Sequence, residues 1–139
     1  MTAMAVPSAH PAPPTFVAFD FGTRRIGVAV GNALLQRAQP LRTIAVAGAA
    51  RFDAIAALLR EWQPDALVVG VPFHPDGAPH VNTERARRFA RQLHGRFGLP
   101  VHEVDERYST TEALAGGARD ADAAAAAILL EQFLRSLGR

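Results

Sequence analysis

Apolar residues recur along this chain with two spacings, one typical of strands and one typical of helices. Two strand-like runs at residues 16–21 and 26–30 are separated by a short turn at 22–25, which predicts a β-hairpin. A third short strand is expected at about residues 41–46. Residues 49–62 then show the helical spacing, and Pro64 predicts the end of that helix. Its apolar stripe comprises Phe52, Ile55, Leu58, Leu59 and Trp62.

The second half of the chain predicts strands joined by helices. Residues 66–71 form a continuous apolar run, which is typical of a central strand covered on both faces. A loop at 72–79 precedes a predicted helix over 82–97, which Gly98 ends, and a fifth strand is expected at 101–105. Residues 109–112 fit a capping box before a short helix. Asp120 or Asp122 is expected to cap the last helix, whose apolar residues include Ile128, Leu129, Phe133 and Leu137.

This order of elements predicts an α/β fold around a mixed five-stranded sheet, with three antiparallel strands followed by parallel crossovers and flanked by helices. The first strand should lie between the second and the fourth. Residues 1–14 are rich in alanine and proline and predict a disordered tail, which leaves residues 15–139 as one domain. A chain of 139 residues, 49% hydrophobic, can bury one core of useful size but hardly two.

Composition narrows the possible chemistry. Cysteine is absent, which excludes disulfides, thiolate zinc sites and a cysteine nucleophile, and fits a reducing compartment such as the cytoplasm. Lysine is also absent, so all fifteen basic residues are arginine. The chain therefore lacks the phosphate loop that ends in Gly-Lys-Ser/Thr and any Schiff-base lysine. No apolar run approaches the ~20 residues that span a bilayer, so we expect neither membrane insertion nor secretion.

Three acidic residues stand where a carboxylate is unusual unless a metal ion is its partner. Asp20 interrupts the apolar run of the first strand, where an unpaired carboxylate would cost several kcal/mol. Glu106 follows the predicted fifth strand, and Asp122 opens an alanine-rich helix. Carboxylates in a strand, at a strand end and at a helix start can converge on a hard divalent cation, which prefers oxygen ligands. The sequence therefore predicts metal-assisted chemistry.

Each of these positions also has a structural interpretation. Asp20 could initiate a turn, Asp122 could cap its helix, and Arg107 could pair locally. The segment at 20–23 is similar to the first phosphate loop of the actin and sugar-kinase superfamily, but this chain is too short for that family's second domain. Two histidines in the loop at 72–79 and just beyond it, His74 and His80, could touch a substrate, although solvated loop residues are the expected outcome.

Taken together, several motifs resemble the YqgF (RuvX) family from residue 16 to about residue 137. They are FDFGTRRIGVAV at 19–30, PLRTI at 40–44, GVP at 70–72 with Asp-Gly at 76–77, DERYST at 105–110, and Asp122 with its alanine run. The resemblance implies an RNase H-like fold related to Holliday-junction resolvases. It also implies a nuclease that matures the 5′ end of pre-16S ribosomal RNA.

The family's three acids correspond to Asp20, Glu106 and Asp122, the positions that the residues themselves had indicated. The resemblance implies that they are both catalytic residues and ligands of one or two Mg²⁺ or Mn²⁺ ions. The arginines that would hold the phosphate backbone are Arg24, Arg25 and Arg107. The sequence departs from the family at Gly31-Asn32, at Tyr108 and in the short stretch 116–121. These departures concern substrate binding more than catalysis.

Two alternatives remain open on the sequence alone. One is a resolvase of branched DNA, because a metal site acts on phosphates and does not read bases. The other is an RNA-binding factor for ribosome assembly that does not cleave, although the presence of all three acids argues against it. Association with ribosomal precursors is expected, as a monomer or a homodimer. The arginines of the predicted helix 82–97 are expected to form a solvated face.

Overall fold

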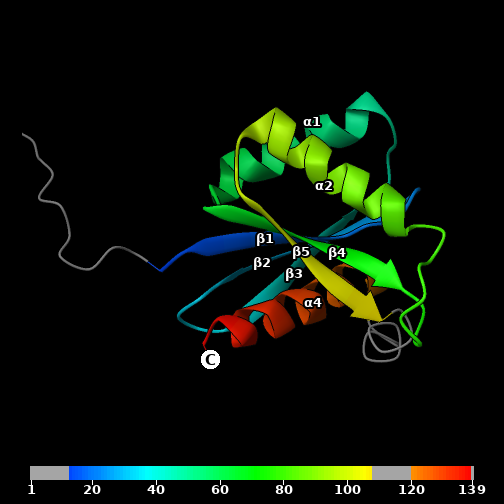
Figure 1. The fold of residues 1–139 in the computed structure, drawn as a ribbon. Helices are drawn as coiled ribbons and strands as arrows, with labels where there is room; N and C mark the ends of the chain where they lie inside the picture. The colour runs from blue at the N-terminus through cyan, green and yellow to red at the C-terminus, as the bar shows by residue number, and fades with distance from the viewer. Residues whose placement is uncertain (1–12, 108–119, 139) are drawn as a thin grey trace, which may run out of the picture.

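A computed structural model of the chain describes residues 13–107 and 120–138. A five-stranded sheet forms its centre, with the strands in the order β3-β2-β1-β4-β5. Helices α1 and α2 lie on one face of the sheet and α4 on the other (Figure 1). The predicted mixed α/β sheet, with β1 between β2 and β4, is confirmed. The strands are β1 (Thr15–Asp20), β2 (Ile26–Asn32), β3 (Arg37–Ile44), β4 (Ala66–Phe73) and β5 (Val101–Arg107), and the helices are α1 (Ala49–Trp62), α2 (Thr83–Phe97) and α4 (Ala121–Leu137).

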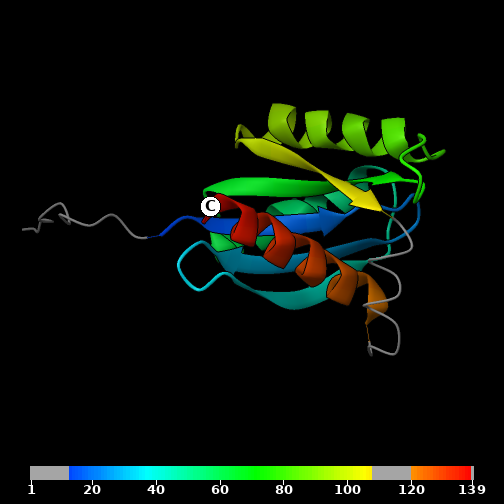
Figure 2. The same cartoon turned by 60° about the horizontal axis from the view of Figure 1, so that its bottom comes forward.

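The strand directions bring several element ends to one edge of the sheet. β1 runs parallel to β4, and β4 runs parallel to β5, so these three strands end at the same edge. β2 is antiparallel to β1 and therefore begins there. The first turn of α4, which crosses in front of the sheet in Figure 2, reaches the same edge. In open α/β sheets the carboxyl ends of the parallel strands are the usual place for a site.

Large side chains fill the face that α1 and α2 cover. Phe19 of β1 is fully buried against Phe89 of α2, with ring centroids 5.8 Å apart in an edge-to-face arrangement. The alternation of a strand places Val17 and Phe19 on this face. Around them pack the other members of this core, which include Ile26, Val28, Ile55, Leu58, Leu67, Val69 and Leu93.

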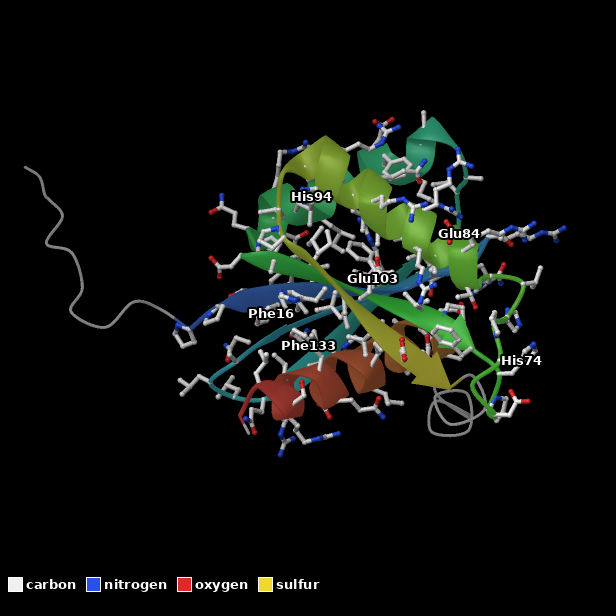
Figure 3. The ribbon with its side chains drawn as sticks, viewed as in Figure 1. Phe16, His74, Glu84, His94, Glu103 and Phe133 are labelled. Atoms are coloured by element: carbon white, nitrogen blue, oxygen red, sulfur yellow. The ribbon has the colours of Figure 1, made fainter. Side chains whose placement is uncertain are left out.

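Small side chains dominate the face that α4 covers. Ala18 and Ala29 from the strands are fully buried there, as is Ala126 of the helix. At the far end from the carboxyl edge, Phe16 packs edge-to-face on Phe133 with 5.3 Å between the ring centroids (Figure 3). The alanine run therefore acts as a close-packing surface, because side chains of one carbon let the helix approach the sheet.

Several predicted boundaries were wrong, each for a local reason. β3 begins at Arg37, since Pro40 is tolerated in an edge strand and the register shifts beside it. β4 continues through Phe73, so the following loop starts later than residue 72. β5 extends to Arg107 because it stays paired with β4, and Glu106 lies inside the strand. On α4, Leu130 and Leu134 are buried while the expected Leu137 is exposed.

Some predictions fall outside the described ranges. They are the tail at 1–12, the capping box and short helix at 109–115, and the glycine pair at 116–117. The division into a tail and one domain at 15–139 likewise stays a prediction. Within residues 13–107 and 120–138, no helix is long and apolar enough to cross a bilayer.

Candidate active site

Asp20 is the last residue of the central strand and projects toward α4. Asp20 shares this face of the sheet with Ala18, and Asp20 is half-buried. Its partners in the two neighbouring strands are both glycines, Gly27 on β2 and Gly70 on β4. Because a glycine has no side chain, the space on either side of Asp20 is open to groups from elsewhere in the fold.

Gly27 allows the backbone of α4 to rest on the sheet. A Cβ atom added at Gly27 would lie 1.8 Å from the carbonyl oxygen of Asp122 and 2.9 Å from the nitrogen of Ala123. Those distances leave no room for any side chain. The first turn of α4 therefore touches β2 at Gly27, the residue that pairs with Asp20. This contact fixes the main chain of Asp122 at the carboxyl edge.

Gly70 makes the corresponding space for Glu106. A Cβ atom added there would lie 2.8 Å from Glu106 Oε1 and 2.7 Å from Leu129 Cδ2. Glu106 stands opposite Pro72 on β4 and is only 7% exposed. Its carboxylate therefore lies over β4 at the residue that pairs with Asp20, and Leu129 of α4 packs alongside.

The Asp122 carboxylate is bound to an arginine. Arg25 Nε donates to Asp122 Oδ2 at 2.6 Å, and the two side chains are 62% and 34% exposed. This hydrogen bond, together with the negative charge of Asp122, raises the pKa of Arg25. Arg25 belongs to the turn that joins β1 to β2, so the pair links that turn to the start of α4 across the edge of the sheet.

Asp120 is the N-terminal cap of α4, a role that the sequence analysis left open between Asp120 and Asp122. Its Oδ1 accepts from the backbone nitrogen of Ala123 at 3.1 Å and from Thr43 Oγ1 at 2.5 Å. Burial raises the pKa of Asp120, but these hydrogen bonds and the charge of Arg25 outweigh it and leave the pKa below its usual value. Asp122 lies within the first turn of α4 and is not its cap, so capping does not account for Asp122.

The structure brings the three acids to one edge and one face, but it does not close them around a common point. Among residues 13–107 and 120–138, no three acidic or histidine side chains are arranged to surround one ion. Glu106 reaches the space over Gly70, which is the β4 partner of Asp20, while the Asp122 carboxylate lies on Arg25. The donor set is nevertheless all oxygen, as Mg²⁺ and Mn²⁺ prefer.

The other predicted contact residues lie around the same edge. Arg24 is exposed in the turn after β1. Arg107 ends β5 opposite Phe73 of β4, and its side chain lies outside the part of the chain that is described. His74 (labelled in Figure 3) and His80 are in the loop after β4, where their rings contact each other with a tilt of 49° and 4.9 Å between the centroids.

The two glycines are the site residues that the sequence analysis missed. Gly27 and Gly70 each interrupt an apolar strand, between Ile26 and Val28 and between Val69 and Val71. A glycine inside a strand weakens it and often marks a close approach of another backbone or group. That signal was available in the sequence, although it does not say which group approaches.

Comparison with known proteins places this geometry in a family. Residues 14–136 match the family described as "RuvX: Holliday junction resolvase". A protein of Albidiferax ferrireducens is 74% identical over 88% of this chain and 79% of its own length. A Polaromonas protein is 66% identical over 99% of both chains. Both carry the name "Putative pre-16S rRNA nuclease".

Solved structures agree on the fold. T. thermophilus RuvC, solved in complex with a Holliday junction substrate, aligns with a TM-score of 0.52 over 90% of this chain and 96% of its own. Its sequence is 16% identical, so the likeness concerns the fold alone. Archaeoglobus fulgidus Pelota gives the same TM-score over 91% of this chain but only 35% of its own. The sheet and its three described helices are thus an RNase H-like arrangement.

Proposed function

The chain belongs to the RuvX family, and we propose that it is a metal-dependent nuclease that processes the 5′ end of pre-16S ribosomal RNA. The observation that carries the proposal is the placement of Asp20, Glu106 and the first turn of α4 at one edge, with glycines clearing the space between them. The names of the curated relatives support the substrate. Such a protein would act in the cytoplasm, where ribosomal RNA is processed.

Asp20, Glu106 and Asp122 would hold one or two Mg²⁺ or Mn²⁺ ions. When bound, such ions activate a water molecule and stabilise the leaving oxygen of a phosphodiester. Asp20 lies on β1, between β2, which the main chain of Asp122 touches, and β4, over which Glu106 reaches. We therefore expect Asp20 to be a ligand whether one ion or two are bound. Glu106, which is buried and lies near Leu129, would provide a second carboxylate.

We expect Arg25 to have two alternative partners, the Asp122 carboxylate and a phosphate of the RNA. In the structure it occupies the Asp122 carboxylate, but the pair is exposed, and exposed ion pairs contribute little to stability. We expect Arg25 to transfer to a phosphate of the RNA backbone, which offers an equally good oxygen acceptor. Asp122 can then turn toward Asp20 and Glu106. Arg24 and Arg107 would contact neighbouring phosphates.

The main experiment separates cleavage from binding in one protein. A pre-16S precursor RNA is offered to wild type and to Asp20→Asn with Mg²⁺, Ca²⁺ or EDTA, and both cleavage and filter binding are measured. We expect wild type to cleave with Mg²⁺ only, because Ca²⁺ accepts looser coordination than octahedral Mg²⁺. Binding should persist in all three conditions, since arginine–phosphate contacts need no metal.

Asp53→Asn is the matched control, because Asp53 is an exposed acid on α1. This variant should cleave like wild type. Mg²⁺ should also raise the melting temperature of wild type and of Asp53→Asn, but not of Asp20→Asn. Cleavage that survives in EDTA, or in Asp20→Asn with Mg²⁺, would exclude the metal-dependent mechanism at these acids. RNA binding without cleavage by wild type in any of the three conditions would leave a binding role alone.

A second experiment tests the exchange at Arg25. If Arg25 and the metal compete for Asp122, Arg25→Gln should bind Mn²⁺ more tightly than wild type while binding RNA more weakly. Arg42→Gln, at an exposed arginine on β3, should change neither. Unchanged Mn²⁺ affinity in Arg25→Gln would show that the ion pair does not compete with the metal.

The family description and the likeness to RuvC favour one other substrate, a four-way DNA junction. The same acids would act on it, since they contact phosphates and metal and read no base. A panel of precursor RNA, single-stranded RNA and DNA junctions at equal concentrations would decide. Faster cleavage of the junction than of the precursor would assign this chain to the resolvases.

A further inference from the structure

A cleft lined by arginines opens on the face of the sheet opposite the acids. It has a volume of about 280 Å³ and lies between the turn after β1, the first turn of α1 and the first half of α2. Among the residues that the structure describes, three arginines and no acidic residue line it. Phe21 and Phe52 supply aromatic surface beside Arg51, Arg85 and Arg88.

Arg51 is the unusual residue of this cleft. It is only 9% exposed, and its partners are carbonyl oxygens: Nη2 donates to Thr23 at 2.7 Å and to Gly22 at 3.3 Å. Within residues 13–107 and 120–138 it forms no ion pair with a carboxylate. Burial lowers the pKa of Arg51. A buried cation without an acidic partner is costly, so a bound anion would stabilise it.

The position of Arg51 in its helix adds to this cost. It lies in the first turn of α1, where the helix dipole is positive and where no acidic residue is present. Acidic groups are favoured at that end of a helix, and cations are disfavoured. The local electrostatics therefore favour an anion beside Arg51.

The arginines of α2 divide into two groups. Arg91 pairs with Glu84 at 2.8 Å, Arg87 lies 3.6 Å from Glu103, and Arg96 stacks on Phe52 at 4.0 Å (Figure 3 labels both acids). Among the described residues, the hydrogen bond that Arg85 makes is a long one, to Asn82 at 3.3 Å. Arg88 has no ion pair within the described part of the chain. Of the five arginines of α2, the two without an ion pair or a ring contact in the described part of the chain, Arg85 and Arg88, are the two that line the cleft.

We infer that this cleft binds a phosphate group of the same nucleic-acid strand that the acids cleave, at a nucleotide away from the cut; this rests on the nuclease function proposed above. Thr23 lines the cleft, and Arg25, two residues later, contacts Asp122. The turn at 22–25 thus separates the two sites, and a strand can pass over it from one to the other. Phe21, which is only partly buried beside the cleft, offers aromatic surface for a base, which favours a single strand.

The test compares two double variants of equal charge. Arg85→Gln with Arg88→Gln removes the exposed arginines of the cleft and leaves the buried Arg51 in place. Arg37→Gln with Arg60→Gln removes two exposed arginines remote from it. Affinity for a fluorescent single-stranded RNA is measured by anisotropy in EDTA across a salt series.

The cleft variant should bind about 10-fold more weakly at low salt. Its slope of log affinity against log salt should fall by about 0.7 for each phosphate that the protein no longer neutralises. The control should match wild type in both. Equal behaviour of the two double variants would overturn the inference. Because the assay contains no metal, it is independent of cleavage, and failure of the nuclease proposal would appear only in the Mg²⁺ assay.

A titration with inorganic phosphate locates the effect. In nuclear magnetic resonance spectra, the backbone amide signals of Gly48 and Arg51 should shift in wild type and shift less in the cleft variant. If those signals stay fixed while signals elsewhere move, phosphate binds outside the cleft and the inference is wrong.

Discussion

The two faces of the sheet hold their helices in different ways. On the α1/α2 face, the large rings of Phe19 and Phe89 make a contact between side chains. On the α4 face, Ala18 meets Ala126, and Gly27 touches the main chain of Asp122. A contact through long side chains can adjust by changing rotamers, whereas a backbone contact cannot. The main chain of Asp122 is thus held by a backbone contact, which adjusts less than a contact between side chains.

The faces also differ in charge at their shared edge. Asp20, Glu106 and Asp122 lie on the α4 face, whereas Arg51, Arg85 and Arg88 surround the cleft on the other. This separation keeps most arginines from neutralising the acids, and only Arg25, among the described residues, crosses it. Under the proposed function, the acids would bind metal and the arginines would bind phosphate within a few residues of the same turn.

The largest expected effect comes from Gly27→Ala. The new methyl group would meet backbone atoms of Asp122, so either α4 moves or the strand distorts. We expect a loss of about 3 kcal/mol in the free energy of unfolding. Urea denaturation measures this change. Gly95→Ala is the control, because Gly95 lies inside α2 with open space around it and alanine should stabilise it by about 0.5–1 kcal/mol. Equal stability of Gly27→Ala and wild type would contradict the backbone contact.

Asp120→Ala should have an intermediate effect. Loss of the helix cap should cost about 1 kcal/mol in the free energy of unfolding. The pKa of Asp120 is lowered in the folded state, so its contribution is present above the unfolded value of 3.8 and is lost as the pH falls through the folded value.

The measurement is urea denaturation of wild type and Asp120→Ala between pH 7 and pH 2. The difference between the two proteins should be constant at neutral pH and shrink below about pH 4. Asp53→Ala, at an exposed acid on α1, should lack this pattern. A stability difference that grows as the pH falls would mean that the pKa of Asp120 is not lowered by folding, and it would contradict this prediction.

Gly70→Ala should affect stability least and activity more. Its methyl group would meet only the ends of the Leu129 and Glu106 side chains, which can move. We expect a loss of about 1 kcal/mol or less in the free energy of unfolding. Cleavage of the precursor RNA should fall about 10- to 100-fold, because Glu106 is displaced. If Gly70→Ala lost as much free energy of unfolding as Gly27→Ala, then the contact at Gly70 would be no more adjustable than the backbone contact at Gly27, which contradicts the comparison made above.

Sequence patterns predicted most of the fold because the relevant forces are local. The helix at 49–62 and the glycine that ends α2 at residue 98 are where the patterns placed them. The ends of β3, β4 and β5 were wrong, since a strand continues as long as its neighbour offers hydrogen bonds. The position of Asp120 as the cap of α4 was one of two possibilities, and Thr43 from β3 contributes to that choice.

The sequence by itself determined the alternation of strands and helices, the three candidate acids and the absence of lysine and cysteine chemistry. These follow from residue types and from spacings within a few residues. Only the tertiary structure decided that Gly27 and Gly70 flank Asp20, that Asp122 lies on Arg25, and that an arginine-lined cleft opens on the opposite face. Each of these facts joins segments that are distant along the chain, and the pairing of such segments depends on how the whole core packs.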